Sequence, residues 1–272
     1  MSATMLERPT ARTDSGLRPT FPRLVRAEWV KLRTLRSTIW IAVLTIGIMG
    51  AFAALFAWAM TAFPDDAPTS AGIVVVGYPI AQLVIAVLGV LVVTGEYATG
   101  SIRSTLAAEP RRLRVVASKA LVLVLAAFVV SVLAIGLSVA VAIPVLQASG
   151  VEVTFAADDI RALIGTVLYL TVSSLFAYGI GLLLKNSAAA ISAVVGVLFI
   201  LPIIVQIIGM TTRIEWIMDA YSYLPAQAGS AVTGVPMGSG SQLDPWMGFA
   251  VFCGYTVALL AAGAVAFSRR DD

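Results

Sequence analysis

Six long runs of apolar residues dominate the sequence, and none of them contains an aspartate or a glutamate. A helix that crosses a membrane needs about 20 predominantly apolar residues, so each run is long enough to do so. Charged residues make up 12% of the 272 residues, about half of the ~25% that is typical of soluble domains. We therefore predict an all-α integral membrane protein with one transmembrane domain over residues 21–268. The six predicted spans are 38–63, 72–94, 117–146, 162–184, 187–209 and 246–267.

The apolar runs also contain two local features. Only Lys185 to Ser187 separate the fourth and fifth spans, which predicts a tight helical hairpin. Pro202 interrupts the fifth span, and a kink or the neighbouring helices must absorb the hydrogen bond that it removes. Among the few polar residues inside the spans, Gln82 and Gln206 favour hydrogen bonds between helices over a role in binding substrate.

The distribution of lysine and arginine predicts the orientation of the chain in its membrane. Of the 18 basic residues, all but Arg161 and Arg213 fall in the N-terminal arm, between spans two and three, in the 185–187 hairpin or at the C-terminus. Basic residues are enriched in cytoplasmic segments. We therefore expect a multi-pass protein of the plasma membrane with both termini in the cytoplasm. Residues 1–20 are expected to be disordered, and residues 269–272 form a cytoplasmic tail. The acidic loops face outside and contain Asp65, Asp66, Glu152, Asp158 and Asp159.

The sequence lacks the residues that several kinds of catalytic and binding sites require. The chain has no histidine, and its one cysteine, Cys253, lies in an apolar run. No phosphate-binding G-x-x-x-x-G-K-[ST] motif and no helix-opening G-x-G-x-x-G motif occurs. The span interiors have almost no charge, which argues against ion-coupled transporters and charged-ring channels. We assign no catalytic, metal-binding or cofactor-binding residue, and any energy for active work must come from another chain.

A basic arm, FPRLVRAEWVKLRTLRST, precedes the first span over residues 21–38. Its apolar residues recur at helical spacing, with Trp29 and Leu32 on one face and Lys31 among the basic residues of the other. Such a helix can lie in the headgroup layer of a membrane. Two interpretations stay open: an anchor that fixes orientation, or a contact for a partner protein.

The stretch GEYATGSIRSTLAAEPRR, residues 95–112, separates spans two and three. Gly100 and Ser101 allow a turn and a helix cap, and Ile102 and Leu106 then fall on one face of a short helix beside Arg103. Pro110 ends that helix. A helix of two turns is not stable alone, so it must dock on its own chain or on a partner. A plain solvated loop is the alternative.

Three segments resemble one membrane protein family. AEWVKLRTLRST ahead of span one resembles the corresponding helix of ABC (ATP-binding cassette) type-2 permeases. GEYATGSIRSTLAAEPRRLRVVASKAL, residues 95–121, resembles the E-[FY]-x-x-G-[ST]-I-R-x-x-L segment of that family, and YLP at 223–225 is a further, shorter match.

The resemblance implies a six-span half-transporter of an exporter. Two permease copies, identical or related, would form the path, and separate cytoplasmic ATPase subunits would bind ATP and Mg²⁺. No nucleic-acid partner is expected. The helix after span two would be the coupling helix that contacts the ATPase. Its contact residues would be Ile102, Arg103 and Leu106, with Gly100 and Ser101 shaping the turn.

The same comparison places Glu96 at the membrane base of span two, and we expect it to pair with Arg33 or Arg36. Two other function classes stay open at this stage. One is a membrane scaffold or regulatory subunit without a transport path. The other is an intramembrane enzyme, which is disfavoured because its catalytic groups are missing. We assign no substrate residue.

Overall fold

The computed structural model describes residues 20–62, 69–148, 150, 153–212, 214–235 and 243–269, and within these ranges all regular structure is helical. Six helical segments are long and apolar enough to cross a membrane, which confirms the predicted fold class. The predicted disordered residues 1–19, the tail residues 270–272 and the acidic Asp65, Asp66 and Glu152 lie outside the described residues. The six segments are α2 Arg36–Met60, α4 Tyr78–Thr99, α6 Arg112–Ala148, α7 Ala157–Leu184, the α8–η2–α9 segment Ser187–Thr212 and α12 Pro245–Arg269.

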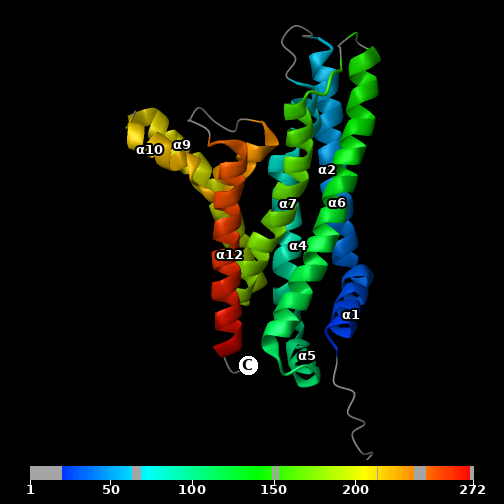
Figure 1. Cartoon of the computed structure of the whole chain (residues 1–272), viewed down its shortest axis with the longest axis vertical. Coiled ribbons are helices and arrows are strands. Elements are labelled where there is room, and N and C mark those ends of the chain that lie inside the picture. Colours follow the sequence, from blue (N-terminus) through cyan, green and yellow to red (C-terminus); the bar gives the residue numbers. More distant parts are fainter. Residues whose placement is uncertain are drawn as a thin grey trace, which may run out of the picture.

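Helices α2, α4, α6 and α7 run side by side as a bundle, and α12 packs along α7 (Figure 1). The 37 residues of α6 correspond to a length of about 55 Å, so this helix extends beyond a hydrocarbon core of about 30 Å. Helix α7 is the most deeply buried of the six segments. The centre of the fold is therefore the contact between α7 and its neighbours.

Helices α4 and α7 pack closely against each other, and Gly89 makes this contact possible. A Cβ atom at Gly89 would lie 2.0 Å from the carbonyl oxygen of Ser174, which is far inside van der Waals contact. Farther along the same contact, the Tyr169 hydroxyl of α7 donates a hydrogen bond to Oε1 of Gln82 on α4, both side chains being buried. This confirms the predicted interhelical role of Gln82.

The second predicted span differs from the structure at both ends. A short helix, α3 Ser70–Val75, ends before Gly77, and α4 then begins at Tyr78 with Pro79 in its first turn. A proline fits there because the first N–H groups of a helix have no partner within it. Helix α4 continues five residues beyond the predicted end at 94, to Thr99. The last turn of α4 therefore contains Glu96, which the apolar run had excluded.

The fifth span contains the predicted interruption at Pro202. Helix α8, Ser187–Val195, passes into a π-helical segment, η2 Gly196–Ile200, and α9 Leu201–Thr212 follows. A proline in a helix clashes with the carbonyl four residues earlier, here that of Leu198 inside η2. The wider π turn occurs where the clash would fall, as π segments do inside α-helices.

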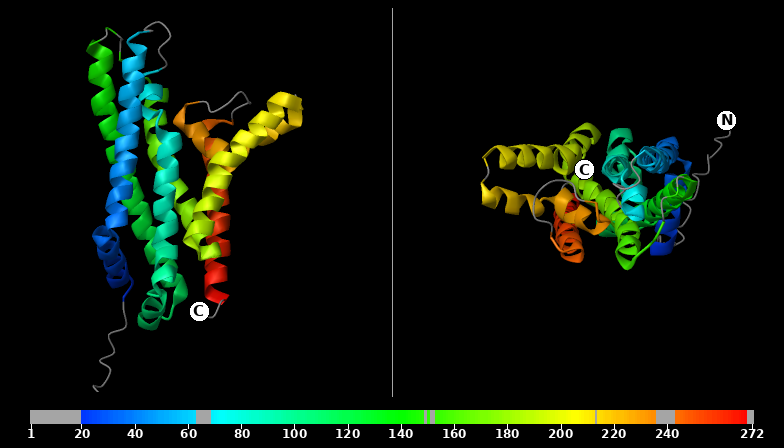
Figure 2. Two further views of the ribbon diagram at one scale, coloured as in Figure 1. Left: turned by 180° about the vertical axis from the view of Figure 1, so that it is seen from behind. Right: turned by 90° about the horizontal axis from the view of Figure 1, so that it is seen from above.

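The two ends of the molecule differ in structure (Figures 1 and 2). One end, called here the α5 end, carries α1 Phe21–Thr34, α5 Ile102–Ala108 and the end of α12. At the opposite end α9 and α10 Glu215–Ser222 project sideways from the bundle. Helix α11 Pro225–Ser230 and the 3-10 turn η3 Ala231–Thr233 then lead back toward α12.

Candidate functional site at the α5 end

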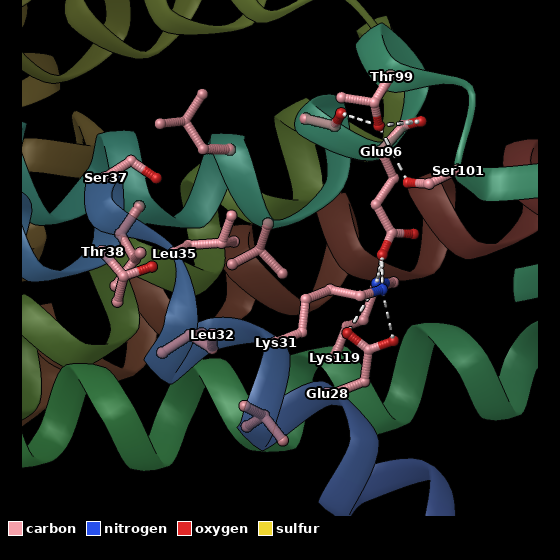
Figure 3. A pocket seen from close by; sticks show the side chains of 15 residues that line it. Glu28, Lys31, Leu32, Leu35, Ser37, Thr38, Glu96, Thr99, Ser101 and Lys119 are labelled. Atoms are coloured by element: carbon pink, nitrogen blue, oxygen red, sulfur yellow. Dashed lines mark hydrogen bonds and ion pairs between the residues drawn. The ribbon is translucent and has the colours of Figure 1, made fainter.

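Four charged side chains from three helices meet at the α5 end (Figure 3). Glu28 and Lys31 come from α1, Glu96 from the last turn of α4, and Lys119 from the start of α6. Lys119 Nζ lies 2.8 Å from Glu28 Oε2 and 2.6 Å from Glu96 Oε1. Lys31 Nζ lies 3.6 Å from Glu28 Oε1 and also donates a hydrogen bond to Glu96 Oε1. These four residues, called here the ion cluster, join α1, α4 and α6 and carry no net charge.

The ion cluster is buried, although it lies near the end of the bundle. Lys119 is 3% exposed, and Glu28 and Glu96 are each 6% exposed. Removing a charge from water costs several kcal/mol unless a well-placed opposite charge and hydrogen bonds offset it. Each lysine here contacts both carboxylates, which provides that compensation. Glu96 Oε2 is nonetheless buried without a hydrogen-bond partner.

Lys31 is the outermost member of the ion cluster, with 41% of its side chain exposed. Partial burial acts to lower the pKa of the Lys31 ammonium. The hydrogen bond to Glu96 and the attraction of Glu28 and Glu96 outweigh burial and raise the pKa above its usual value of 10.5. Lys31 is therefore charged throughout the neutral pH range.

Helix α1 is held on the bundle by the residues around the ion cluster. Leu32 is buried against Val122 and Ala126 of α6, and Val25 and Trp29 pack on the same small apolar cluster. Glu28 lies within this row, because residues 25, 28, 29 and 32 follow the spacing of one helix face. One face of α1 therefore contacts the protein itself, while Arg23, Arg26 and Arg33 are exposed.

The predicted pairing of Glu96 with Arg33 or Arg36 is wrong, because Lys31 and Lys119 occupy those places. Arg33 is two residues beyond Lys31, about 200° round the helix at 3.6 residues per turn, so it faces away from the cluster. Arg36 belongs to the next helix, α2.

Two members of the ion cluster, Glu28 and Lys119, were not predicted as site residues. A signal for Glu28 was present, since it is an acid on the apolar stripe of an otherwise basic helix. Lys119 lies near the start of the predicted third span, and its ammonium points inward to both carboxylates.

The predicted short helix is present as α5, between α4 and α6. Gly100 ends α4 with a left-handed backbone, at φ 72°, which a glycine adopts without strain. Glu109 is extended before Pro110 and ends α5, as predicted. The predicted side-chain cap by Ser101 is wrong. Ser101 occupies the cap position without capping the helix, and its hydroxyl lies 3.0 Å from the Thr99 hydroxyl.

The two faces of α5 have different surroundings. Ile102 is 5% exposed and packs in a cluster with Val93, Val116 and Phe267 of the same chain. Leu106 is partly buried against that cluster. Arg103 and Ser104 are exposed. Among the residues predicted to contact a partner, the structure thus leaves Arg103 accessible and uses Ile102 to dock α5 on its own bundle.

The predicted hairpin between the fourth and fifth spans turns at the same end of the molecule. Lys185 has a left-handed backbone at φ 55° and places its ammonium 4.8 Å from the centre of the Tyr97 ring. The Ser187 hydroxyl donates a hydrogen bond of 2.8 Å to the Thr94 hydroxyl of α4. The α7–α8 turn is thereby tied to the last turns of α4, close to the ion cluster.

A pocket of about 490 Å³ lies beside the ion cluster, between the α1–α2 junction, α4 and α6 (Figure 3). Its walls are mainly apolar, and all four cluster residues contribute to its lining. The described residues contain no group of three histidine, cysteine or acidic side chains placed to bind a metal. The site thus offers ion pairs, an apolar pocket and a short helix with an exposed face.

These features define a multi-span membrane protein with a short, partly exposed helix at one end. The sequence model for ABC-2 family transporter proteins matches residues 24–272. The chain belongs to this family and is a membrane permease component of an ABC transporter. A search of curated proteins found no match.

Proposed function

We propose that this chain is the permease subunit of an ATP-driven exporter, that it forms the translocation path as a dimer, and that separate ATPase subunits drive it. The α5 end and both termini face the cytoplasm of the plasma membrane in this proposal, as the placement of the basic residues favours. ATP and Mg²⁺ bind to the partner ATPase. The two permease copies are identical or related.

The observation that carries the proposal is the docked helix α5 with its exposed polar face. Seven residues are too few for a helix to persist alone, and Ile102 anchors it on the bundle. Arg103 and Ser104 remain accessible on the outer side. This arrangement suits a rigid contact for another protein, with Arg103 as its charged residue.

A displacement of α5 would be transmitted directly to the helices of the bundle. Helix α5 lies between α4 and α6 in the chain, and these two helices carry Glu96 and Lys119. The ion cluster links both of them to α1 through Glu28 and Lys31. A push on α5 by an ATPase would therefore displace α1, α4 and α6 together. The role of these residues in coupling is part of the proposal.

The test compares reversal of charge at Arg103 with the same change at Arg26, which is exposed on α1 at the same end. Membranes from the native host would be solubilised in mild detergent, and proteins bound to each variant identified by mass spectrometry. Arg103→Glu should lose at least tenfold of the co-purifying ATPase, and Arg26→Glu should retain it. Ile102→Asp should undock α5 and reduce both ATPase binding and folded yield.

Two results would contradict the proposal in different ways. Full ATPase binding and normal ligand-stimulated hydrolysis by Arg103→Glu would remove α5 as the coupling contact. No ATPase with the wild-type chain would instead favour the alternative, a membrane scaffold or regulatory subunit without transport.

A further inference from the structure

The corner between α5 and α6 forms the tip of the α5 end (Figure 1). Only residues 109–111 separate the two helices. Four exposed side chains lie on α5, in this connection and in the first turn of α6, and they are called here the corner surface. They are Arg103, Arg111, Leu113 and Arg114.

The register of α6 against α2 shows how far this corner extends. Gly50 of α2 lies against Leu137 of α6, because a Cβ atom at Gly50 would be 2.9 Å from Leu137 Cδ2. Both helices run from the α5 end toward the opposite end of the molecule. Counting back from this contact, the start of α2 at Arg36 lies level with Leu123 of α6. Helix α6 begins at Arg112, about 16 Å farther out at 1.5 Å per residue.

The corner surface therefore lies beyond the lipid headgroups. The apolar part of the first span begins after Arg36, so the edge of the hydrocarbon core lies near the start of α2. The headgroup region adds about 5–8 Å on each side of that core. A corner about 16 Å beyond the start of α2 passes through this layer into water. The surface of the membrane is thus too far away to cover the corner.

Helix α1 carries a second set of basic residues, and it lies nearer the membrane. Glu28 of α1 pairs with Lys119, and Leu32 packs on Val122. These two contacts lie about 10–15 Å along α6 from its first residue. Figure 1 also shows α5 nearer the tip of the molecule than α1. The exposed arginines of α1 are therefore level with the headgroups, whereas those of the corner surface lie beyond them.

Positive charge is exposed at this end, and the acids are buried. The acidic residues that the structure describes at the α5 end are Glu28, Glu96 and Glu109, which are 6%, 6% and 5% exposed. Glu109 accepts a hydrogen bond from the Arg111 N–H and lies 3.9 Å from the Arg114 guanidinium. In the described part of the chain, the corner surface thus presents guanidinium groups without an exposed carboxylate beside them.

The residue types of the corner surface are those of a protein interface. All three of its charged residues are arginines. Arginine is enriched in protein–protein interfaces, whereas lysine and the acids are depleted there. One guanidinium group can donate two parallel hydrogen bonds to one carboxylate. Leu113 is 60% exposed among these arginines and offers an apolar contact. A partner that presents carboxylates fits this surface.

We infer that the ATPase binds this chain through an acidic surface, and that the contact extends from α5 over the whole corner surface to the start of α6. This inference rests on the proposed function, because it concerns the same partner. Arg103 and Arg111 pair with carboxylates of the ATPase, and the ATPase covers Leu113. Because α6 continues from Leu113 to Lys119 as one helix, the contact acts on the ion cluster through α6 as well as through α5.

The test uses the ATPase that co-purifies with the full-length chain, identified by mass spectrometry and then purified alone. Its binding to the chain is measured in nanodiscs of dioleoyl phosphatidylcholine at ~0.1 M and ~1 M NaCl, between which the Debye length falls from ~10 Å to ~3 Å. Binding to the wild type should weaken at least tenfold at the higher concentration. Arg111→Glu and Leu113→Glu should each weaken binding at least tenfold at the lower concentration, and Arg111→Lys should lose less. Arg111→Glu should also reduce the dependence on salt, which a purely structural role would leave unchanged.

The matched controls lie on α1, outside the corner surface. Arg23→Glu and Val30→Glu make the same changes at exposed positions, and Val30 is 52% exposed. Both controls should bind the ATPase as the wild type does at each salt concentration. Size-exclusion profiles of all variants show whether the chain is folded.

The possible failures point to different errors. If no ATPase co-purifies with the wild type, the proposed function is wrong and this inference with it. If the ATPase binds but either corner variant leaves its binding unchanged, only the inference is wrong. Binding to the wild type that does not change with salt would show that the contacting surface of the ATPase is not acidic. Binding in phosphatidylglycerol nanodiscs but not in phosphatidylcholine would assign the corner surface to an anionic membrane instead.

Discussion

Lys119 is the residue on which the ion cluster depends. Its ammonium contacts two buried carboxylates from two other helices, at 2.8 Å from Glu28 and 2.6 Å from Glu96. Without it, Lys31 alone would face both acids from a side that is partly exposed. Removal of one partner from a buried ion pair is strongly destabilising, because the other charge stays buried without full compensation.

We therefore expect Lys119→Met to lower the free energy of unfolding by about 3–5 kcal/mol. Arg114→Ala is the control, since its ion pair with Glu109 spans 3.9 Å and the arginine is 43% exposed. Because the buried Glu109 keeps the hydrogen bond that it accepts from the Arg111 N–H, loss of this distant, half-exposed partner should cost less than loss of Lys119. The measurement is thermal or chemical unfolding in detergent, followed by size-exclusion fluorescence.

A second comparison separates charge burial from simple loss of packing. The triple variant Glu28→Gln, Lys119→Met, Glu96→Gln removes the buried charges together, and it should recover much of the stability lost by Lys119→Met alone. Equal destabilisation in the single and triple variants would show that shape, rather than unpaired charge, explains the effect.

At the scale of helices, the contact between α4 and α7 depends on a glycine. Gly89→Ala would bring a methyl group to 2.0 Å from the Ser174 carbonyl oxygen, and only a shift of one helix backbone could relieve that clash. We expect destabilisation at or above the ~1–3 kcal/mol of ordinary overpacking. Gly136→Ala on α6 is the control, because its Cβ would have no atom within 4 Å. It should be neutral or stabilising by up to ~1 kcal/mol.

The clash prediction is checked by the thermal midpoints of the two variants in the same detergent. A midpoint for Gly89→Ala equal to that of Gly136→Ala would mean that α4 and α7 can separate freely at this depth. The close contact would then not be a determinant of the fold.

The positions of the six membrane helices can be predicted well from the sequence, because each helix corresponds to one apolar run that is long enough to cross a bilayer. The two ends of α5 could also be predicted from local sequence, because Gly100 precedes the helix and Pro110 follows it. The break before α4 was missed, since the run remains apolar through Gly77. Local composition therefore determines where helices lie, and it is less informative about where they stop.

The ion cluster could not be predicted in the same way. Lys119 is 91 residues from Glu28 and 23 from Glu96 along the chain. These residues meet only because α1, α4 and α6 pack together. The number of basic residues near the membrane does not indicate which acid each of them pairs with. Only Glu28 on its apolar stripe carried a local sign of burial.

At the scale of the whole molecule, the six spans are unequally covered. Most residues of helix α7 are buried in the bundle, whereas only a minority are buried in α2, in the α8–η2–α9 segment and in α12. Exposed side chains on these elements include Trp40, Ile207 and Val257. Lipid or a second copy of the chain must cover them, which agrees with the proposed dimer.

The two ends of the molecule differ, so its orientation in the membrane can be tested directly. Ser104 is exposed on α5, and Asp219 is exposed on α10 at the opposite end. In a Cys253→Ser background, each position would be changed to cysteine and intact cells treated with a membrane-impermeant maleimide. Because basic residues concentrate at the α5 end, we expect Asp219→Cys to react in intact cells and Ser104→Cys to react only after the membrane is opened. Labelling of Ser104→Cys in intact cells, with Asp219→Cys protected, would reverse the orientation and place α5 out of reach of any cytoplasmic ATPase.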